Sequence, residues 1–371
     1  MLAIYLRTLL VCWQTYGPRP PFWAWLIGEP LMKLFTFATL ALDHLFFPGF
    51  RHCQVKKPIF IIGHPRSGTT FLHQLLNQPG ETAAFPAWHL LFPALSARFL
   101  LRPLIQKAIA KGKAEMMPES TGHRMALDKI EEEEMLFMHN YATQFMEIGI
   151  LGFGEQEYRE IGRHDQQPGA ERFRALIFLD GCLKRQIQAT GCQQIIAQTH
   201  FSTHRLKTML AFYPDAKFIY IVRDPLQVVP SFLSLLHASI EFRWGIKAIT
   251  PKVLQRYNER RYQAMIALYR YFHDLQTGGE LPAERVMVLP YPLLRANLQL
   301  AFDRIAAFAD LNPSPQLRQA IAERAGRQKE YQRKHQVQPL AAFGLSAERI
   351  REDFAFVYEA YPELAQARDN Q

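Results

Sequence analysis

Apolar residues in this chain gather in short runs, and three of these runs predict buried strands. They lie at residues 58–62, 216–222 and 285–289, and helix-like segments follow, for example at 71–77 and 295–310. Strands that alternate with helices are typical of a parallel sheet covered by helices. The pattern therefore predicts an α/β fold built on a parallel sheet.

The first 55 residues have a different pattern, in which dense apolar runs are broken early by charged residues. They hold Trp13, Trp23 and Trp25, three of the five tryptophans, and their longest uninterrupted apolar run spans residues 34–42. A membrane-spanning helix needs about 20 apolar residues, and the basic start and cleavage site of a signal peptide are missing. We expect a helical segment over residues 1–55 that lies at a membrane interface or packs on the core, and the pattern leaves both open.

Residues 56–371 form the second expected unit, an α/β domain with a mostly helical insertion at about 98–192. The insertion carries four consecutive glutamates, Glu131 to Glu134. Side chains that follow one another on a helix point in different directions. The pattern therefore favours a solvated helix face over a pocket lined by Glu132 or Glu134.

Composition narrows the class of partner. The formal net charge of +9 favours an anionic cofactor, an anionic membrane surface or nucleic acid. No DNA- or RNA-binding motif accompanies the charge, so we expect no nucleic-acid partner. The four cysteines show neither metal-ligand spacing nor a disulfide framework, which favours a cytoplasmic, reducing compartment and no metal; they are Cys12, Cys53, Cys182 and Cys192.

Candidate chemistry begins directly after the first predicted strand, in Gly63-His64-Pro65-Arg66-Ser67-Gly68-Thr69-Thr70. The two glycines have the spacing of the P-loop pattern, but Thr69 stands where the lysine that reaches the β- and γ-phosphates belongs. A strand, a glycine turn and a helix N-terminus bind anions through backbone N–H groups, and the planar guanidinium of Arg66 adds a second anion-binding group. The loop predicts a nucleotide phosphate site that is not built for a triphosphate with magnesium.

A second anion site is predicted at the end of the strand at 216–222. Arg223 follows this strand, and Ser231 comes eight positions later in a predicted helix. The carboxyl edge of an open parallel sheet is where ligands bind. Arg223 and Ser231 are therefore placed to hold one phosphate together, whereas Asp224 is expected to cap the helix.

Together these two segments resemble the PAPS-dependent sulfotransferases, where PAPS is 3′-phosphoadenosine 5′-phosphosulfate. The resemblance spans roughly residues 56–360 and is closest to the bacterial branch with a Pro-Arg-Ser-Gly-Thr-Thr loop, which is related to protein-tyrosine sulfotransferases. It implies a P-loop-like three-layer fold and transfer of a sulfuryl group from PAPS to an acceptor hydroxyl, without a metal. It also implies that the 5′-phosphosulfate is held by Arg66, Ser67, Gly68, Thr69 and Thr70, and the 3′-phosphate by Arg223 and Ser231.

This chemistry needs a general base for the acceptor hydroxyl. His89 stands where many relatives carry a glutamate, and imidazole accepts protons near neutral pH. We predict His89 as the base and Arg66 as the group that neutralises the leaving phosphate. Gln198 stands where relatives often carry a lysine. The reserve candidates for the base are Glu132, Glu134, His123 and His200.

The apolar segment at residues 1–50 favours a lipophilic acceptor and peripheral membrane contact. The acceptor is expected to bind in the insertion at 98–192. The basic run at 324–334 predicts either a loop over the 3′-phosphate or a solvated helix, and Trp244 either stacks on the adenine or belongs to the core.

Two alternative functions come from other classes. One is a P-loop kinase for small molecules, against which the missing lysine counts. The other is a catalytically inactive, membrane-associated protein that retains nucleotide binding.

Overall fold

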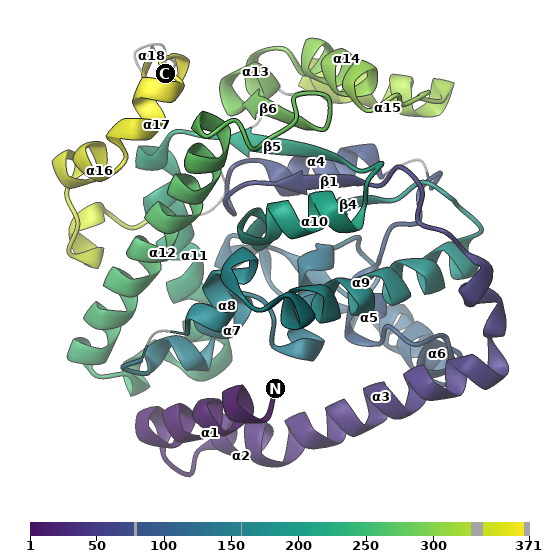
Figure 1. Cartoon of the computed structure of the whole chain (residues 1–371). Helices are drawn as coiled ribbons and strands as arrows, with labels where there is room; N and C mark the ends of the chain where they lie inside the picture. Colours follow the sequence, from purple (N-terminus) through teal and green to yellow (C-terminus); the bar gives the residue numbers. More distant parts are fainter. Residues whose placement is uncertain (78–79, 157, 328–336, 367–371) are drawn as a thin grey trace.

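The chain forms a four-stranded parallel sheet with helices on both faces (Figure 1). The structure is a computed structural model, and it describes residues 1–77, 80–156, 158–327 and 337–366. The strand order is β4-β1-β5-β6, with every neighbouring pair parallel. The strands are β1 (Ile59–Ile62), β4 (Ile196–Gln198), β5 (Lys217–Val222) and β6 (Val286–Pro290).

The predicted α/β class and its three strands are thus confirmed, and the prediction omitted β4. That strand has only three residues, which is too short for an apolar run to stand out from a buried helical segment. A separate two-stranded antiparallel sheet, β2 (Glu115–Met117) with β3 (Met125–Ala126), lies in the region that we expected to be mostly helical.

Helices account for most of the remaining chain. The α-helices are α1 (Leu2–Tyr16), α2 (Pro20–Trp23), α3 (Glu29–Phe46), α4 (Thr69–Leu76), α5 (Ala87–Leu91), α6 (Leu95–Ala110), α7 (Phe145–Ile148), α8 (Arg159–Gly162), α9 (Gly169–Thr190), α10 (Leu206–Phe212), α11 (Pro225–Trp244), α12 (Pro251–Thr277), α13 (Tyr291–Ala296), α14 (Leu298–Phe308), α15 (Pro315–Arg327), α16 (Ala347–Asp353), α17 (Ala355–Ala360) and α18 (Glu363–Gln366). A π-helix, η1 (Ala24–Gly28), joins α2 to α3, and short 3₁₀ segments include η4 (Glu133–Asn140) and η7 (His200–Arg205).

The alternation of side chains along β1 divides the core into two layers. Successive residues of a strand point to opposite faces of a sheet. Ile59 and Ile61 belong to the apolar cluster formed with α4, α14 and α15, which lie above the sheet in Figure 1. Phe60 and Ile62 belong to the larger cluster formed with α9, α11 and α12 below it. Because both faces of the sheet are covered, only its carboxyl edge is left for ligands.

Two local predictions differ from the structure. The helix expected at 295–310 is divided into α13 and α14, because the Asn297 side chain accepts a hydrogen bond from the Leu300 N–H at 2.9 Å and starts a new helix there. The glutamate run does not lie on an α-helix. Glu132 has an extended backbone and precedes η4.

The N-terminal helices lie along the base of the molecule, at the lower end of Figure 1. Among the described residues, one continuous helix, Pro20–Phe46, is long and apolar enough to cross a membrane, judged by length and composition alone. The charged residues within this continuous helix, Glu29, Lys33 and Asp43, face the protein body. The apolar residues between them form a continuous outer face of the helix. This face is longer than the uninterrupted apolar run at residues 34–42 had indicated.

Candidate active site

The carboxyl ends of β1 and β5 open into a cavity of about 1390 Å³. A parallel sheet brings the loops that follow neighbouring strands to one edge, and both predicted phosphate-binding segments meet there. The cavity is lined by six of the seven residues predicted to hold PAPS: Arg66, Gly68, Thr69, Thr70, Arg223 and Ser231.

Two glycines fix the path of the loop. Gly63 has φ +122°, and a Cβ there would lie 2.6 Å from the backbone oxygen of Ile221 on β5. Gly68 has φ +94°, and its Cβ would lie 2.9 Å from the ring of Tyr291. Residues with a side chain rarely adopt either conformation. The loop therefore needs glycine at both positions to leave the sheet and enter α4.

The seventh predicted residue, Ser67, turns inward. Its side chain is fully buried and its backbone N–H donates to the His64 carbonyl at 3.1 Å, so it shapes the loop from beneath. Thr69 and Thr70 instead form the first turn of α4. The first N–H groups of a helix have no acceptor within it, and the helix dipole places positive charge there. The start of α4 is thus the part of the loop best suited to an anion.

Side chains from two loops converge beside this helix end. Arg66 donates through Nε to the Ser231 hydroxyl at 3.1 Å and through a terminal nitrogen to the Gly122 carbonyl at 3.0 Å. Arg223 donates to the Arg66 carbonyl at 2.8 Å, and its guanidinium lies 4.1 Å from the centre of the Tyr291 ring. The loop after β1 and the helix after β5 are therefore connected directly.

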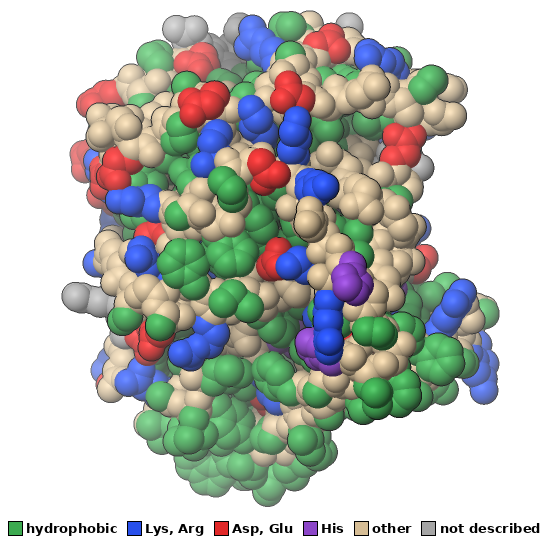
Figure 2. Space-filling view, turned by 45° about the vertical axis from the view of Figure 1, so that its right-hand side comes forward, with side chains coloured by type: hydrophobic (Ala, Val, Ile, Leu, Met, Phe, Trp, Pro, Cys, Tyr) green, Lys and Arg blue, Asp and Glu red, His purple; other side chains and the backbone are tan. Residues whose placement is uncertain are grey.

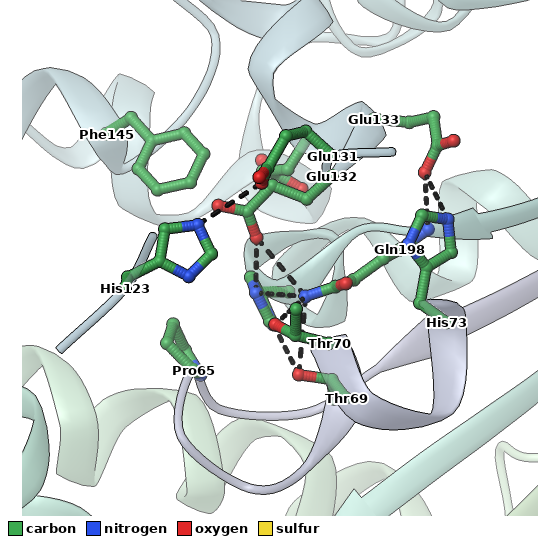
Figure 3. A network of polar contacts seen from close by, with 12 residues as sticks. Pro65, Thr69, Thr70, His73, His123, Glu131, Glu132, Glu133, Phe145 and Gln198 are labelled. Carbon is green, nitrogen blue, oxygen red and sulfur yellow. Dashed lines mark hydrogen bonds and ion pairs between the residues drawn. The ribbon is translucent and has the colours of Figure 1, made fainter. Parts of the chain in front are cut away.

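A polar network continues from the two threonines into the wall of the cavity (Figure 3). The Gln198 side-chain amide donates to the Thr70 hydroxyl at 3.0 Å and to the Glu132 carboxylate at 3.3 Å. His200 forms an ion pair with Glu132 and lies 3.3 Å from the Thr69 hydroxyl. Burial alone would raise the pKa of Glu132, but His200 holds that pKa below its ordinary value. An ionised carboxylate thus lies in the cavity wall, and the side chain of Gln198 connects it to Thr70 of the loop.

The other three glutamates of the run are buried, so the expected solvated helix face is wrong. Glu131 lies 3.2 Å from His123, which lines the cavity, and Glu133 lies 3.2 Å from His73. Burial would lower the pKa of both histidines, but the carboxylates raise it above its ordinary value. A buried charge is stable only with such partners. Further contacts include the Gln198 N–H to Glu133 at 2.7 Å, the Ser202 hydroxyl to Glu134 at 3.0 Å and an ion pair of Arg205 with Glu134 at 3.9 Å.

His89, the predicted base, is not brought into the cavity. It lies on α5, and its Nδ1 is 3.1 Å from the side-chain oxygen of Gln186. Burial, together with the positive charge of Arg98, lowers the pKa of His89 to about 3. The neighbouring Leu91 lines the cavity instead. Of the reserve candidates, Glu132, His123 and His200 line the cavity, whereas Glu134 is buried behind it.

The apolar half of the cavity was not predicted. It is rich in methionine, with Met116, Met117, Met125, Met135 and Met138 on its wall. The density of methionine between residues 116 and 138 is a signal that could have been used, since flexible thioether side chains adapt to varied apolar ligands. Phe145, Ile148, Phe153 and Trp244 add to this wall.

The expected basic run at 324–334 is described only in part. Arg324 and Arg327, in the last turn of α15, line the cavity. Residues 328–334 of that run lie outside the described residues. Among the residues that the structure describes, no group of three or more His, Cys, Asp or Glu side chains is arranged to hold a metal ion.

Comparisons with known proteins agree with this geometry. The sulfotransferase family model matches residues 58–315. The omega-hydroxy-beta-dihydromenaquinone-9 sulfotransferases Stf3 of Mycobacterium tuberculosis (strain CDC 1551 / Oshkosh) and Mycobacterium bovis (strain ATCC BAA-935 / AF2122/97) are each 26% identical over 230 residues, 60% of this chain and 55% of theirs. The chain thus spans about half the length of these curated relatives.

Two solved structures show the same fold. Sulfotransferase STF9 from Mycobacterium avium superposes with a TM-score of 0.72 at 14% identity, covering 96% of this chain and 91% of its own. Sulfotransferase STF1 from Mycobacterium tuberculosis H37Rv superposes with a TM-score of 0.64 at 18% identity, covering 95% of this chain and 91% of its own. Because the family model covers most of the sequence, including both predicted anion-binding segments, this chain belongs to the sulfotransferase family.

Proposed function

We propose that this protein transfers a sulfuryl group from PAPS to a hydroxyl of a lipophilic acceptor, releasing a sulfate ester and adenosine 3′,5′-bisphosphate. The observation that carries the proposal is the meeting of Arg66, the start of α4, Arg223 and Ser231 in one cavity. All of these groups can donate hydrogen bonds to anions, and two are guanidinium groups, which suit phosphate and sulfate geometry. The donor set therefore fits a ligand with two separate anionic groups.

The residues divide between the two ends of that ligand. Arg66, Thr69 and Thr70 hold the 5′-phosphosulfate with the first N–H groups of α4, and Ser67 and Gly68 give the loop its shape. Arg223 and Ser231 hold the 3′-phosphate. PAPS supplies an activated sulfuryl group whose leaving group is a phosphate. Arg66 and the helix end are positioned to neutralise charge there, which is the main catalytic task in transfers with a loose transition state.

Glu132 is the general base in this proposal, in place of His89. It lines the cavity, it is ionised because His200 lowers its pKa, and Gln198 connects it to Thr70. It can therefore accept the proton that the acceptor hydroxyl loses on attack. His89 is engaged with Gln186 away from the cavity. Gln198 and His200 act as positioning residues that hold the carboxylate toward the loop.

A lipophilic acceptor is supported by the apolar, methionine-rich half of the cavity. The name of the Stf3 relatives also specifies a hydroxylated menaquinone, which is a lipid. A lipid acceptor is most concentrated in a membrane, and the outer face of the N-terminal helices is apolar. We therefore also propose that the enzyme is cytoplasmic and contacts the membrane peripherally through residues 1–50.

Ligand-dependent thermal stability tests the donor. A ligand that binds only the native state at 100 times its dissociation constant stabilises it by about 2.7 kcal/mol. Adenosine 3′,5′-bisphosphate should raise the melting temperature, and Arg223→Ala should abolish the rise. Arg318→Ala, an exposed arginine on α15, is the matched control and should keep it. A rise with ATP and magnesium but not with the bisphosphate would refute the proposal in favour of a kinase.

Turnover tests the base. With PAPS and a panel of hydroxylated isoprenoid lipids, Glu132→Gln should lower kcat by about 10²–10⁴-fold while bisphosphate binding persists. His89→Asn should retain most of the activity. The opposite result would return the role of base to His89. Bisphosphate binding without sulfation of any lipid, phenol or alcohol would instead support a catalytically inactive binding protein.

A further inference from the structure

Helix α3 is amphipathic, but its polar residues face the protein and its apolar residues face outward. Glu29, Lys33, Thr36 and Asp43 recur at helical spacing along one face, and each is buried or half-buried. A surface helix of a protein in water normally has the opposite arrangement. The outward side chains are apolar and exposed: Leu31, Met32, Leu34, Phe37, Leu42, Leu45 and Phe46.

Polar contacts at two points hold α3 in this orientation. Near its start, the Lys33 ammonium donates to the Met138 carbonyl at 3.0 Å. Near its end, the Asp43 carboxylate accepts the Leu95 N–H at 2.9 Å and forms an ion pair with Arg185 at 2.6 Å. Rotating the helix to hide its apolar face would break these buried contacts, and an uncompensated buried charge is costly. The apolar face is therefore fixed outward.

Neighbouring helices extend this surface, which we call the apolar base. Helix α6 packs beside α3. Figure 2 shows hydrophobic side chains gathered over the lower end of the molecule, where Figure 1 places α1, α2 and α3. Besides the residues of α3, the apolar base includes Leu2, Leu6, Leu10 and Trp13 of α1, Trp23 of α2, Leu26 and Ile27 of η1, and Phe99, Leu100 and Leu104 of α6.

The charges around the apolar base identify its partner. Residues 1–56 and 95–114 contain only two acidic residues, Glu29 and Asp43, and both face the protein body. A second copy of this face would bring like charges together, whereas anionic lipid headgroups complement them. The exposed Lys and Arg side chains of these segments are Arg7, Arg19, Arg51, Lys56, Arg102, Lys107, Lys111 and Lys113.

We propose that the apolar base inserts into one leaflet of a bilayer containing anionic lipids, with α3 in the plane of the membrane. An interfacial helix of this kind buries its apolar face to about 5–10 Å. The 27 residues of Pro20–Phe46 are long enough to span. Spanning would require Glu29, Lys33 and Asp43 to leave their partners and enter hydrocarbon, which strongly disfavours it.

This position places the membrane beside the acceptor end of the cavity, and in that respect the inference rests on the proposed function. Met138 and Phe153 line the cavity. The carbonyl of Met138 binds Lys33 of α3, and the ring of Phe153 lies 6.2 Å from that of Tyr16 on α1. The membrane-facing helices thus back the apolar wall directly, which puts the acceptor half of the cavity next to the bilayer.

Vesicle flotation of the full chain tests the inference without using sulfation. Vesicles of phosphatidylcholine are compared with vesicles of phosphatidylcholine and phosphatidylglycerol in equal parts. The test variants are Leu34→Glu and Phe99→Glu, at side chains that are 68% and 73% exposed, and the control is Leu300→Glu, 40% exposed on α14 at the opposite end of the molecule. Bisphosphate-dependent melting of each variant shows that it is folded and reports separately on nucleotide binding.

We expect binding to anionic vesicles that weakens about tenfold or more in each test variant and is unchanged in Leu300→Glu. Tryptophan fluorescence should be quenched more by lipids brominated near the headgroup than near the bilayer centre. Three results would overturn the inference: no flotation with either vesicle, a soluble dimer that Leu34→Glu dissociates, or quenching strongest from the bilayer centre. Flotation by a protein that fails to bind the bisphosphate would sustain membrane docking and refute only the proposed function.

Discussion

Replacing Gly63 by alanine tests whether the shape of the phosphate loop depends on the absence of a side chain. The residue has φ +122°, a conformation for which strain of about 1–3 kcal/mol is typical in other residues. The added Cβ would also lie 2.6 Å from the Ile221 carbonyl oxygen. Because that oxygen belongs to β5 in the middle of the sheet, no side chain can rotate to relieve the overlap.

Overpacking of a rigid site costs about 1–3 kcal/mol. We therefore expect Gly63→Ala to lower the free energy of unfolding by about 4 kcal/mol in total. The matched control is Gly191→Ala at the end of α9. Its φ is +74° and nothing lies within 4 Å of the added Cβ, so only the backbone strain of about 1–2 kcal/mol remains.

Urea unfolding of the two variants and the native chain gives the comparison. Losses that agree within about 0.5 kcal/mol would refute the reasoning, because they would show that the contact with β5 costs nothing beyond backbone strain. Bisphosphate binding adds a functional measurement. Folded Gly63→Ala should bind more weakly than the native chain, whereas Gly191→Ala should bind equally well.

Three further predictions follow from buried charges. Because Glu133 raises the pKa of His73, the pair stabilises the fold fully below the unfolded histidine pKa of about 6.5 and loses this effect as pH rises through the folded pKa. The loss of unfolding free energy caused by Glu133→Gln, measured by urea unfolding, should therefore be larger at pH 6 than at pH 9. An equal loss at the two pH values would contradict this. Asp43→Asn should cost about 3–5 kcal/mol in the same assay, since it leaves the buried Arg185 without its carboxylate; a loss below about 1 kcal/mol would show that the pair is dispensable. Because the pKa of Glu132 is held below its ordinary value, sulfation activity should stay level from pH 7.5 down to about pH 5, and a fall centred near pH 6.5 would indicate a histidine base.

The sheet, and the meeting of the two predicted anion-binding segments at its edge, were predictable because their signals are local. A strand followed by Gly63 to Thr70, and another followed by Arg223, specify which residues reach the carboxyl edge once the strands are parallel. The inward turn of Ser67 was not predictable, since it depends on a hydrogen bond to His64 that only the folded loop forms.

The role of the glutamate run depends on contacts that are distant in sequence. Glu132 and Glu133 are 68 and 60 residues away from their histidine partners, His200 and His73. A run of acidic residues normally indicates a solvated helix face, and the spacing of residues along the chain carries no signal that these would be neutralised. For the same reason the sequence did not indicate that His89 lies outside the cavity lining. Its partner, Gln186, lies on α9, 97 residues later.

The hydrogen bond from Arg223 to the backbone of Arg66 has a consequence for ligand selection. The side chain of Arg66 reaches Ser231 while its carbonyl receives Arg223, so the two arginines form one unit whose spacing is set by the chain itself. A site of this kind favours ligands whose two anionic groups are separated by a matching distance. Under the proposed function, a nucleotide that carries only one phosphate would engage one end and leave the other arginine to its protein partners. Discrimination among nucleotides would then depend mainly on the distance between their anionic groups, with the identity of the base as a secondary factor.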